Sequence, residues 1–242
     1  MRSALCLLVM ALCGCKSISS VRAPEVSGGN RGYIVGGPRV APSAPVAADD
    51  FDALIRAGQS AAFVAENDSQ VDKRREAAKR GIIVARRARE LKPDRVEGHY
   101  WYALNTGFLA DVDRSYGLDA VAEMEPALKR AGEIDERYDY AGPLRVLGIL
   151  LLRTPQPPVS IGSPRKGLRL LQRAVELLPG YPENHIYLGE ALREAGRADE
   201  AKAAWQKALT LPAPADRKSE AEKWKNHARN LLASNAAGGA SR

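Results

Sequence analysis

Apolar residues recur with the three-to-four-residue spacing of amphipathic helices from about residue 51 to residue 233. Stretches rich in proline, glycine or acidic residues interrupt this pattern, notably at residues 111–117 and 153–164. The pattern therefore predicts an all-α domain of nine helices. They cover residues 51–66, 71–91, 97–110, 118–133, 140–152, a stretch around Gly167 to Ala174, 182–195, a stretch around Asp199 to Ala208, and 217–233.

A short motif, a basic residue followed by alanine and ending in an aliphatic residue, recurs through this region with minor variation. Its alanines are Ala88, Ala131, Ala174 and Ala208, separated by 43, 43 and 34 residues. A fixed period of this size indicates stacked helical pairs, and 34 residues is the period of the tetratricopeptide repeat. The longer intervals are explained by the two long loops.

The last unit carries the residue pattern of such a repeat most clearly. Small residues let two antiparallel helices approach closely, large ones fill the gap between neighbouring units, and proline ends the unit. The sequence resembles tetratricopeptide repeats, which predicts a right-handed helical solenoid of about four helix pairs plus a C-terminal capping helix. The predicted repeat-packing residues are Leu147, Gly148, Ala174, Leu188, Gly189, Ala201, Trp205 and Ala208.

The N-terminus resembles the signal peptide of a bacterial lipoprotein. Arg2 precedes an apolar run too short to span a bilayer, and this run ends in Leu12-Cys13-Gly14-Cys15. The resemblance implies cleavage before Cys15 and attachment of lipid to its sulfur, with two or three acyl chains giving stable anchoring. Because Lys16, and not aspartate, follows the cysteine, it implies the outer membrane, with the protein facing the periplasm. A plain secretory peptide cut elsewhere is the alternative.

These features divide the chain into four segments. Residues 1–14 are predicted as the signal peptide and residues 15–50, rich in Ser, Gly and Pro, as a lipidated N-terminus and flexible linker. Residues 51–234 are predicted as the repeat domain and residues 235–242 as a disordered tail. All three cysteines lie at or before Cys15, so the domain is held by packing without disulfides.

The chain carries a formal net charge of +7, and most of the excess lies in one predicted helix. Residues 71–92 hold nine Lys and Arg against three Asp and Glu, a local net charge of +6. In the periplasm such a patch would meet lipid head groups, lipopolysaccharide, acidic proteins or small carboxylates, and we expect no nucleic-acid partner. A solvated helical face is the simpler interpretation.

The sequence offers little catalytic chemistry. No zinc-protease, nucleophile-elbow or phosphate-binding glycine motif occurs. Asp111, Asp113 and Ser115 imitate the start of a calcium loop, but the glycine comes late at Gly117 and Ala122 stands where glutamate is needed. We therefore expect no enzyme, no metal and no cofactor.

Three further stretches resemble a narrower family. They are residues 99–105 (HYWYALN), 140–145 (YAGPLR) and 182–185 (PENH), together with the proline loop after Leu152. They are similar to the T-component family of tripartite ATP-independent periplasmic (TRAP) transporters, over roughly residues 51–212. The resemblance implies an accessory subunit of a solute-uptake system that partners a periplasmic solute-binding protein or another envelope protein. A pilotin-like assembly factor for a secretin or another envelope machine is the alternative, and a homo-oligomer is possible.

A helical solenoid binds partners with the groove formed by the first helices of its pairs. We expect the binding residues on those helices to be side chains that packing leaves free. The predicted partner or ligand groove comprises Tyr100, Tyr102, Asn105, Arg145 and Asn184. Arg74, Arg75 and Arg86 are expected on the opposite, convex side, where they mainly set the salt dependence of association.

Overall fold

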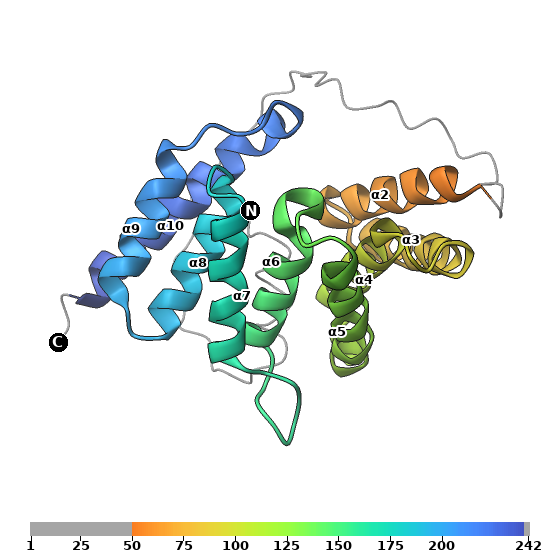
Figure 1. Ribbon diagram of the computed structural model, residues 1–242, viewed down its shortest axis with the longest axis horizontal. Helices are drawn as coiled ribbons and strands as arrows, with labels where there is room; N and C mark the ends of the chain where they lie inside the picture. The colour runs from red at the N-terminus through yellow and green to blue at the C-terminus, as the bar shows by residue number, and fades with distance from the viewer. Residues whose placement is uncertain (1–49, 240–242) are drawn as a thin grey trace.

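The computed structural model describes residues 50–239, and these residues form nine α-helices and two short 3₁₀ segments (Figure 1). No strand occurs within this part of the chain. The helices are α2 (Phe51–Asn67), α3 (Val71–Leu91), α4 (Val96–Val112), α5 (Gly117–Ile134), α6 (Tyr138–Arg153), α7 (Pro164–Leu177), α8 (Pro182–Glu194), α9 (Ala198–Thr210) and α10 (Ala221–Gly239), with 3₁₀ segments η1 (Arg114–Tyr116) and η2 (Ala215–Glu220).

Consecutive helices pack as antiparallel pairs, α2 with α3, α4 with α5, α6 with α7 and α8 with α9, and α10 caps the last pair (Figure 1). The first helices of successive pairs also touch one another, whereas the described second helices make at most marginal contact with the next second helix. We call the side of α2, α4, α6 and α8 the inner face and the side of α3, α5, α7 and α9 the outer face. The fold is an all-α, right-handed, tetratricopeptide-like solenoid, as predicted.

Local sequence determines where these helices begin and how closely they pack. The Asp50 side chain accepts a hydrogen bond from the Ala53 amide and caps α2, and Pro164 and Pro182 occupy the first turns of α7 and α8. Gly196 ends the α8 region with φ +76°, a conformation that favours glycine. A side chain at Gly189 would overlap the indole of Trp205, so glycine is what allows α8 and α9 to approach.

The C-terminal region differs from the prediction. The expected helix over residues 217–233 is replaced by η2 and by α10, which begins later and continues to Gly239, inside the stretch assigned to a tail. No helix among the described residues is long and apolar enough to cross a membrane. The predicted signal peptide, Cys15 and the linker up to residue 49 lie outside the described residues.

Candidate interaction site on the inner face

The α6 helix begins with a left-handed turn that the sequence pattern did not reveal. Asp139, Tyr140 and Ala141 all have positive φ, at 46°, 57° and 63°. Non-glycine residues in this conformation cost on the order of 1–2 kcal/mol each, because Cβ approaches the following carbonyl oxygen. Such strain persists only where surrounding contacts enforce it, and it clusters at functional sites.

Side chains from α6 itself and from two other helices hold this turn in place. The Arg145 guanidinium donates to the carbonyl oxygens of Tyr140 (2.9 Å) and Asp139 (3.4 Å), and the Asn184 amide donates to the Tyr140 carbonyl oxygen (3.2 Å). Arg145 also donates to Oδ1 of Asn184 (3.0 Å). From α4, the Tyr100 hydroxyl donates to Oδ2 of Asp139 (2.5 Å). The strained turn is thus a junction between α4, α6 and α8.

Aromatic rings cover the turn on the side of the C-terminal cap. The rings of Tyr140 and Tyr181 are stacked, with centroids 4.4 Å apart and planes 3° from parallel, and Trp224 of α10 meets Tyr181 edge-on at 5.2 Å. The Arg145 guanidinium lies 5.1 Å from the Tyr181 ring centroid, and that of Arg217 lies 5.9 Å from the Tyr140 centroid. Cationic groups therefore lie close to the rings of both stacked tyrosines.

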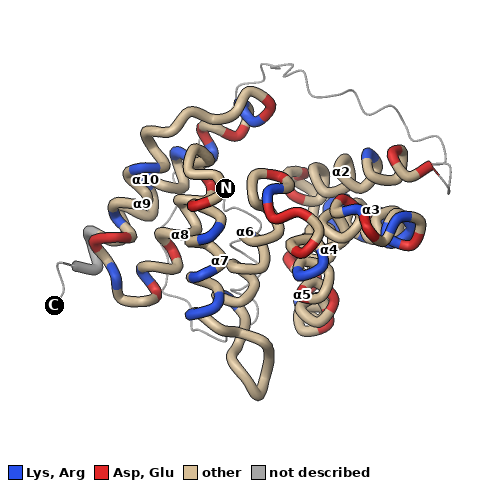
Figure 2. Tube along the Cα trace, in the orientation of Figure 1, with Lys and Arg blue, Asp and Glu red and all other residues tan. Residues whose placement is uncertain are grey.

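Carboxylates neutralise the buried cation of this junction. Arg145 pairs with Glu183 (3.3 Å) and Asp139 (3.7 Å), and only 5% of its side chain is exposed. Burial opposes its charge, but the nearby Glu183 carboxylate and other acidic groups raise the pKa of Arg145 above its usual value. Burial, together with Glu183, raises the pKa of the Glu220 carboxyl. Charged residues of both signs also occupy the α5–α6 connection (Figure 2).

The C-terminal segment completes the inner-face site. Arg217 of η2 forms an ion pair with Asp139, Asp216 accepts a hydrogen bond from the Tyr140 hydroxyl (2.6 Å), and Lys223 of α10 pairs with Glu66 at the end of α2. This last contact joins the first helix and the last helix of the described array. We define the inner-face site as Glu66, Asp139, Tyr140, Arg145, Tyr181, Glu183, Arg217, Glu220 and Lys223.

The predicted groove residues are packed and not free, which corrects the expectation made for them. The Asn105 amide donates to the carbonyl oxygens of Gly58 (3.1 Å) and Trp101 (2.8 Å), so it ties α4 to α2. Most residues of α4, α6 and α8 are buried, whereas α2 keeps exposed residues such as Phe63. The five residues Tyr100, Tyr102, Asn105, Arg145 and Asn184 are all buried.

Tyr102 also lies away from the inner-face site. Its hydroxyl donates to Glu123 of α5, and the Arg89 guanidinium of α3 lies 4.1 Å from its ring centroid. Both partners belong to second helices, so Tyr102 faces outward. Arg145, Asn184 and Tyr100 do meet at the left-handed turn, where they support the site without being exposed in it.

The basic helix α3 is only partly the solvated surface that its composition suggested. Arg74 donates to Oδ2 of Asp111 (2.5 Å) and to the Ala65 carbonyl oxygen (2.7 Å), so it links α3 to α4 and α2. Arg75 pairs with Asp72 and donates to the Val112 carbonyl oxygen (3.5 Å). Arg74 is therefore a contact between helices, whereas the expected effect of Arg74, Arg75 and Arg86 on the salt dependence of association stays a prediction. The sequence could not place Asp111 beside Arg74.

The residues assigned to repeat packing lie between helices. Trp205 is fully buried, and its indole donates to the Ile186 carbonyl oxygen (3.0 Å). Leu188 is only partly buried. Leu147, Gly148, Ala174, Gly189, Ala201 and Ala208 are buried.

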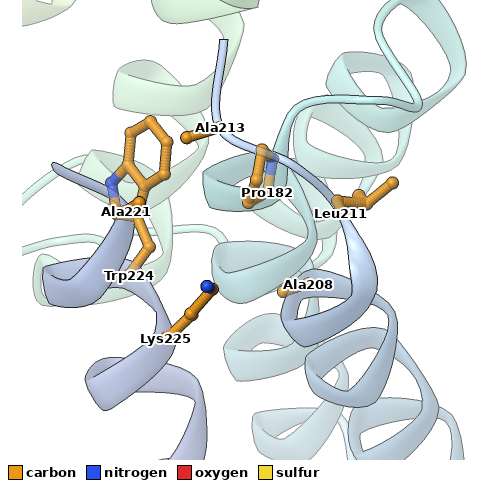
Figure 3. A pocket seen from close by; sticks show the side chains of 7 residues that line it. All are labelled: Pro182, Ala208, Leu211, Ala213, Ala221, Trp224 and Lys225. Carbon is orange, nitrogen blue, oxygen red and sulfur yellow. The ribbon is translucent and has the colours of Figure 1, made fainter. Parts of the chain in front are cut away.

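The cavity beside the C-terminal capping helix is too small for an organic ligand. It has a volume of about 10 Å³, room for roughly one water molecule, and lies between α8, α9 and α10 (Figure 3). Pro182, Ala208, Leu211, Ala213 and Trp224 are among its lining residues. Within residues 50–239, no group of three or more His, Asp or Glu residues is placed to hold a metal ion. Asp111 is engaged by Arg74, and Asp113 accepts a hydrogen bond from the Ser115 amide (3.2 Å) as a cap.

Sequence reasoning missed Asp139, Tyr181 and Arg217. No sequence pattern marks three consecutive left-handed residues without glycine. The contact of Asp139 with the C-terminal segment was therefore not predictable. Gly142-Pro143 did not reveal the turn either, because proline restricts only the residue before it, and Gly142 is not among the three left-handed residues. A side chain at Gly142 would collide with the Tyr100 ring, which explains the glycine.

Comparisons with known proteins support the fold. No protein-family model matches the chain, and no curated protein matches it. Among solved structures, a thermophilic TPR protein of Thermus thermophilus is similar, with a TM-score of 0.50 and 20% sequence identity, over 77% of this chain and 90% of that chain. At this identity the likeness shows the fold. The chain has a tetratricopeptide-like fold.

Proposed function

We propose that this protein is a lipid-anchored scaffold in the periplasm, held at the outer membrane through Cys15, and that it serves a TRAP-type solute-uptake system as a T-component-like accessory subunit. The observation that carries the scaffold role is the inner face, where the first helices of all four pairs and the capping region meet around one polar and aromatic site. Arrays of this kind bind protein segments on that face.

An apolar side chain also stands exposed on the inner face. Phe63 of α2 is 69% exposed, and it lies four residues after Gln59, which interacts with the Tyr138 hydroxyl, and three before Glu66, which pairs with Lys223. Residues three and four apart share one face of a helix. Phe63 thus offers an aromatic contact beside the inner-face site, and aromatic anchors contribute strongly to protein interfaces.

The anchor is supported by the sequence Leu12-Cys13-Gly14-Cys15 after a short apolar run. Its test is fatty-acid labelling of cells that express the wild type, Cys15→Ser or the matched control Cys13→Ser. We expect label in the wild type and in the control and none in Cys15→Ser, which should also leave the outer-membrane fraction. Label retained by Cys15→Ser would contradict the proposed anchor.

The partner is tested by capturing the full chain from gently solubilised envelopes after chemical cross-linking. A cross-linked periplasmic solute-binding protein supports the transport role. A secretin in its place supports the pilotin-like alternative. If neither the solute-binding protein nor the secretin is captured, both the transport role and the pilotin-like role are contradicted, and only the general scaffold role remains.

A further inference from the structure

The η2 segment lies on the inner face without being part of the packed core. None of its residues is buried. Its backbone bonds are local, from the Arg217 amide to the Pro214 carbonyl oxygen (2.9 Å) and from the Ala221 amide to that of Lys218. Its attachment to α6 is through side chains, namely Asp216 on Tyr140 and Arg217 on Asp139. The Asp216 contact is exposed and the Arg217–Asp139 pair is largely shielded, but no core residue holds the segment, so it can open locally.

The following helix is anchored differently. In α10, Trp224 and Ala228 are buried, and His227 lies 3.3 Å from the buried Glu190 carboxylate. Release of η2 therefore does not require α10 to leave the array. Substitutions in η2 can therefore release this segment while α10 stays in place.

The η2 segment covers a preformed site for a guanidinium group. The Asp139 carboxylate, only 10% exposed, is held by the strained turn and by Tyr100, and the Tyr140 ring lies close to the Arg217 guanidinium. Glu220, which accepts a hydrogen bond from Arg217 (3.4 Å), belongs to η2 itself. A carboxylate beside an aromatic ring is the combination that binds arginine well. In this structure, Arg217 is its occupant.

The charges of the inner-face site show that its cations come largely from the C-terminal segment. With η2 released and α10 still packed, three carboxylates, Glu66, Asp139 and Glu183, face two cations, Arg145 and Lys223. The remaining face is acidic, although the whole chain carries +7. Burial of Lys223 acts to lower its pKa, but the neighbouring Glu66 carboxylate outweighs burial and the pKa is raised. This face therefore favours positive charge.

We propose that the inner-face site is a docking site for an arginine-bearing segment of a partner protein, and that η2 occupies it in cis through Arg217 until such a segment displaces it. The proposal rests on the scaffold function and adds the chemistry of the partner. A peptide segment fits better than a free small cation, because Phe63 adds apolar surface along the same face.

Occupation in cis lowers the apparent affinity for any external segment. If η2 is docked in about nine molecules of ten, its release raises the apparent affinity about tenfold. Arg217→Ala removes the cis guanidinium while leaving Asp139 and Tyr140 intact. Arg229→Ala is the matched control, since it removes an exposed α10 arginine that pairs with Glu222 outside the site.

The test uses the full-length chain in detergent and two fluorescein-labelled peptides, one with the sequence of residues 212–220 and one with the same sequence carrying Arg217→Ala. Fluorescence anisotropy gives the dissociation constants. We expect the arginine peptide to bind Arg217→Ala about tenfold more tightly than it binds the wild type or Arg229→Ala. The alanine peptide should bind none of them measurably.

Equal binding of the arginine peptide to the wild type and Arg217→Ala, or equal binding of the two peptides to Arg217→Ala, would overturn the proposal. Asp216→Ala in the chain gives a second, milder release, because it removes only the hydrogen bond that Asp216 accepts from the Tyr140 hydroxyl and leaves the site and the peptide unchanged. It should increase binding by a smaller factor, and no increase would count against cis occupation. Partner capture from envelopes is read independently, so the scaffold function can stand where this proposal fails.

Discussion

The arginines of α6 and α3 are the same residue type in opposite settings. Arg145 of α6 lies inside the array, bound to two backbone carbonyl groups, one amide and two carboxylates. On α3, Arg75 pairs with Asp72, and Lys79 with Glu76, one turn apart along the same helix (Figure 2). The inner cation organises a fold junction, whereas the outer ones mostly neutralise neighbours. The high density of charged residues in α3 therefore does not identify the helix whose arginine organises the junction, which is α6.

The largest effect that sharpens this comparison is expected for Arg145→Met. It leaves the partly buried Glu183 without its cation, Asp139 with Arg217 alone, and the left-handed turn without two of its hydrogen bonds. We expect a loss of about 3–5 kcal/mol in the free energy of unfolding. Urea unfolding followed by circular dichroism measures it, with Lys79→Met as the matched surface control. A loss below about 1 kcal/mol would contradict the claim that Arg145 organises the junction between α4, α6 and α8.

Arg74 is the exception on α3, because it joins this helix to α4 and α2, and Arg74→Gln tests that contact. Because it leaves the Asp111 carboxylate, 2% exposed, without its ion pair, we expect a loss of about 1–3 kcal/mol at neutral pH. Burial already raises the pKa of Asp111, even though Arg74 opposes the shift. A carboxyl group whose pKa is raised by folding binds its proton more tightly in the folded state, so its cost to stability falls on acidification.

The deficit of Arg74→Gln relative to the wild type should therefore shrink as the pH is lowered from about 7 to about 4. The hydrogen bond from Arg74 to the Ala65 carbonyl oxygen accounts for a part that does not change with pH. Unfolding curves at both pH values give the two parts. A deficit that grows on acidification would show that Asp111 is not the group left unpaired.

The sequence predicted the array because its signals are local and periodic. The alanine of each repeat motif and the Gly189–Trp205 approach depend on neighbours close in sequence, and the helix starts follow Pro164 and Pro182. The inner-face site depends on contacts between residues far apart, such as Asp139 with Arg217 and Glu66 with Lys223. Composition does not encode such pairings. The pattern indicated that Arg145 and Asn184 matter on the inner side, but not that they are buried.

The smallest effect is expected for Lys79→Gln, which removes an exposed pair with Glu76 (3.4 Å). Exposed pairs one turn apart contribute less than about 1 kcal/mol, and salt screens them. The variant should unfold like the wild type, and any difference should vanish at high salt. A larger loss that persists in salt would mean that the outer face of α3 carries structure as well as charge.

The central claim is that partners bind the inner face, and site-specific photocross-linking tests it most directly. Phe63 on the inner face and Ile83 on α3 are both apolar and exposed, at 69% and 65%, so a photoreactive phenylalanine analogue can replace either with similar disturbance. The account predicts a cross-link to a periplasmic solute-binding protein from position 63 and none from position 83, suppressed by the arginine peptide of residues 212–220. A cross-link from position 83 alone would contradict it and make the outer face the binding surface.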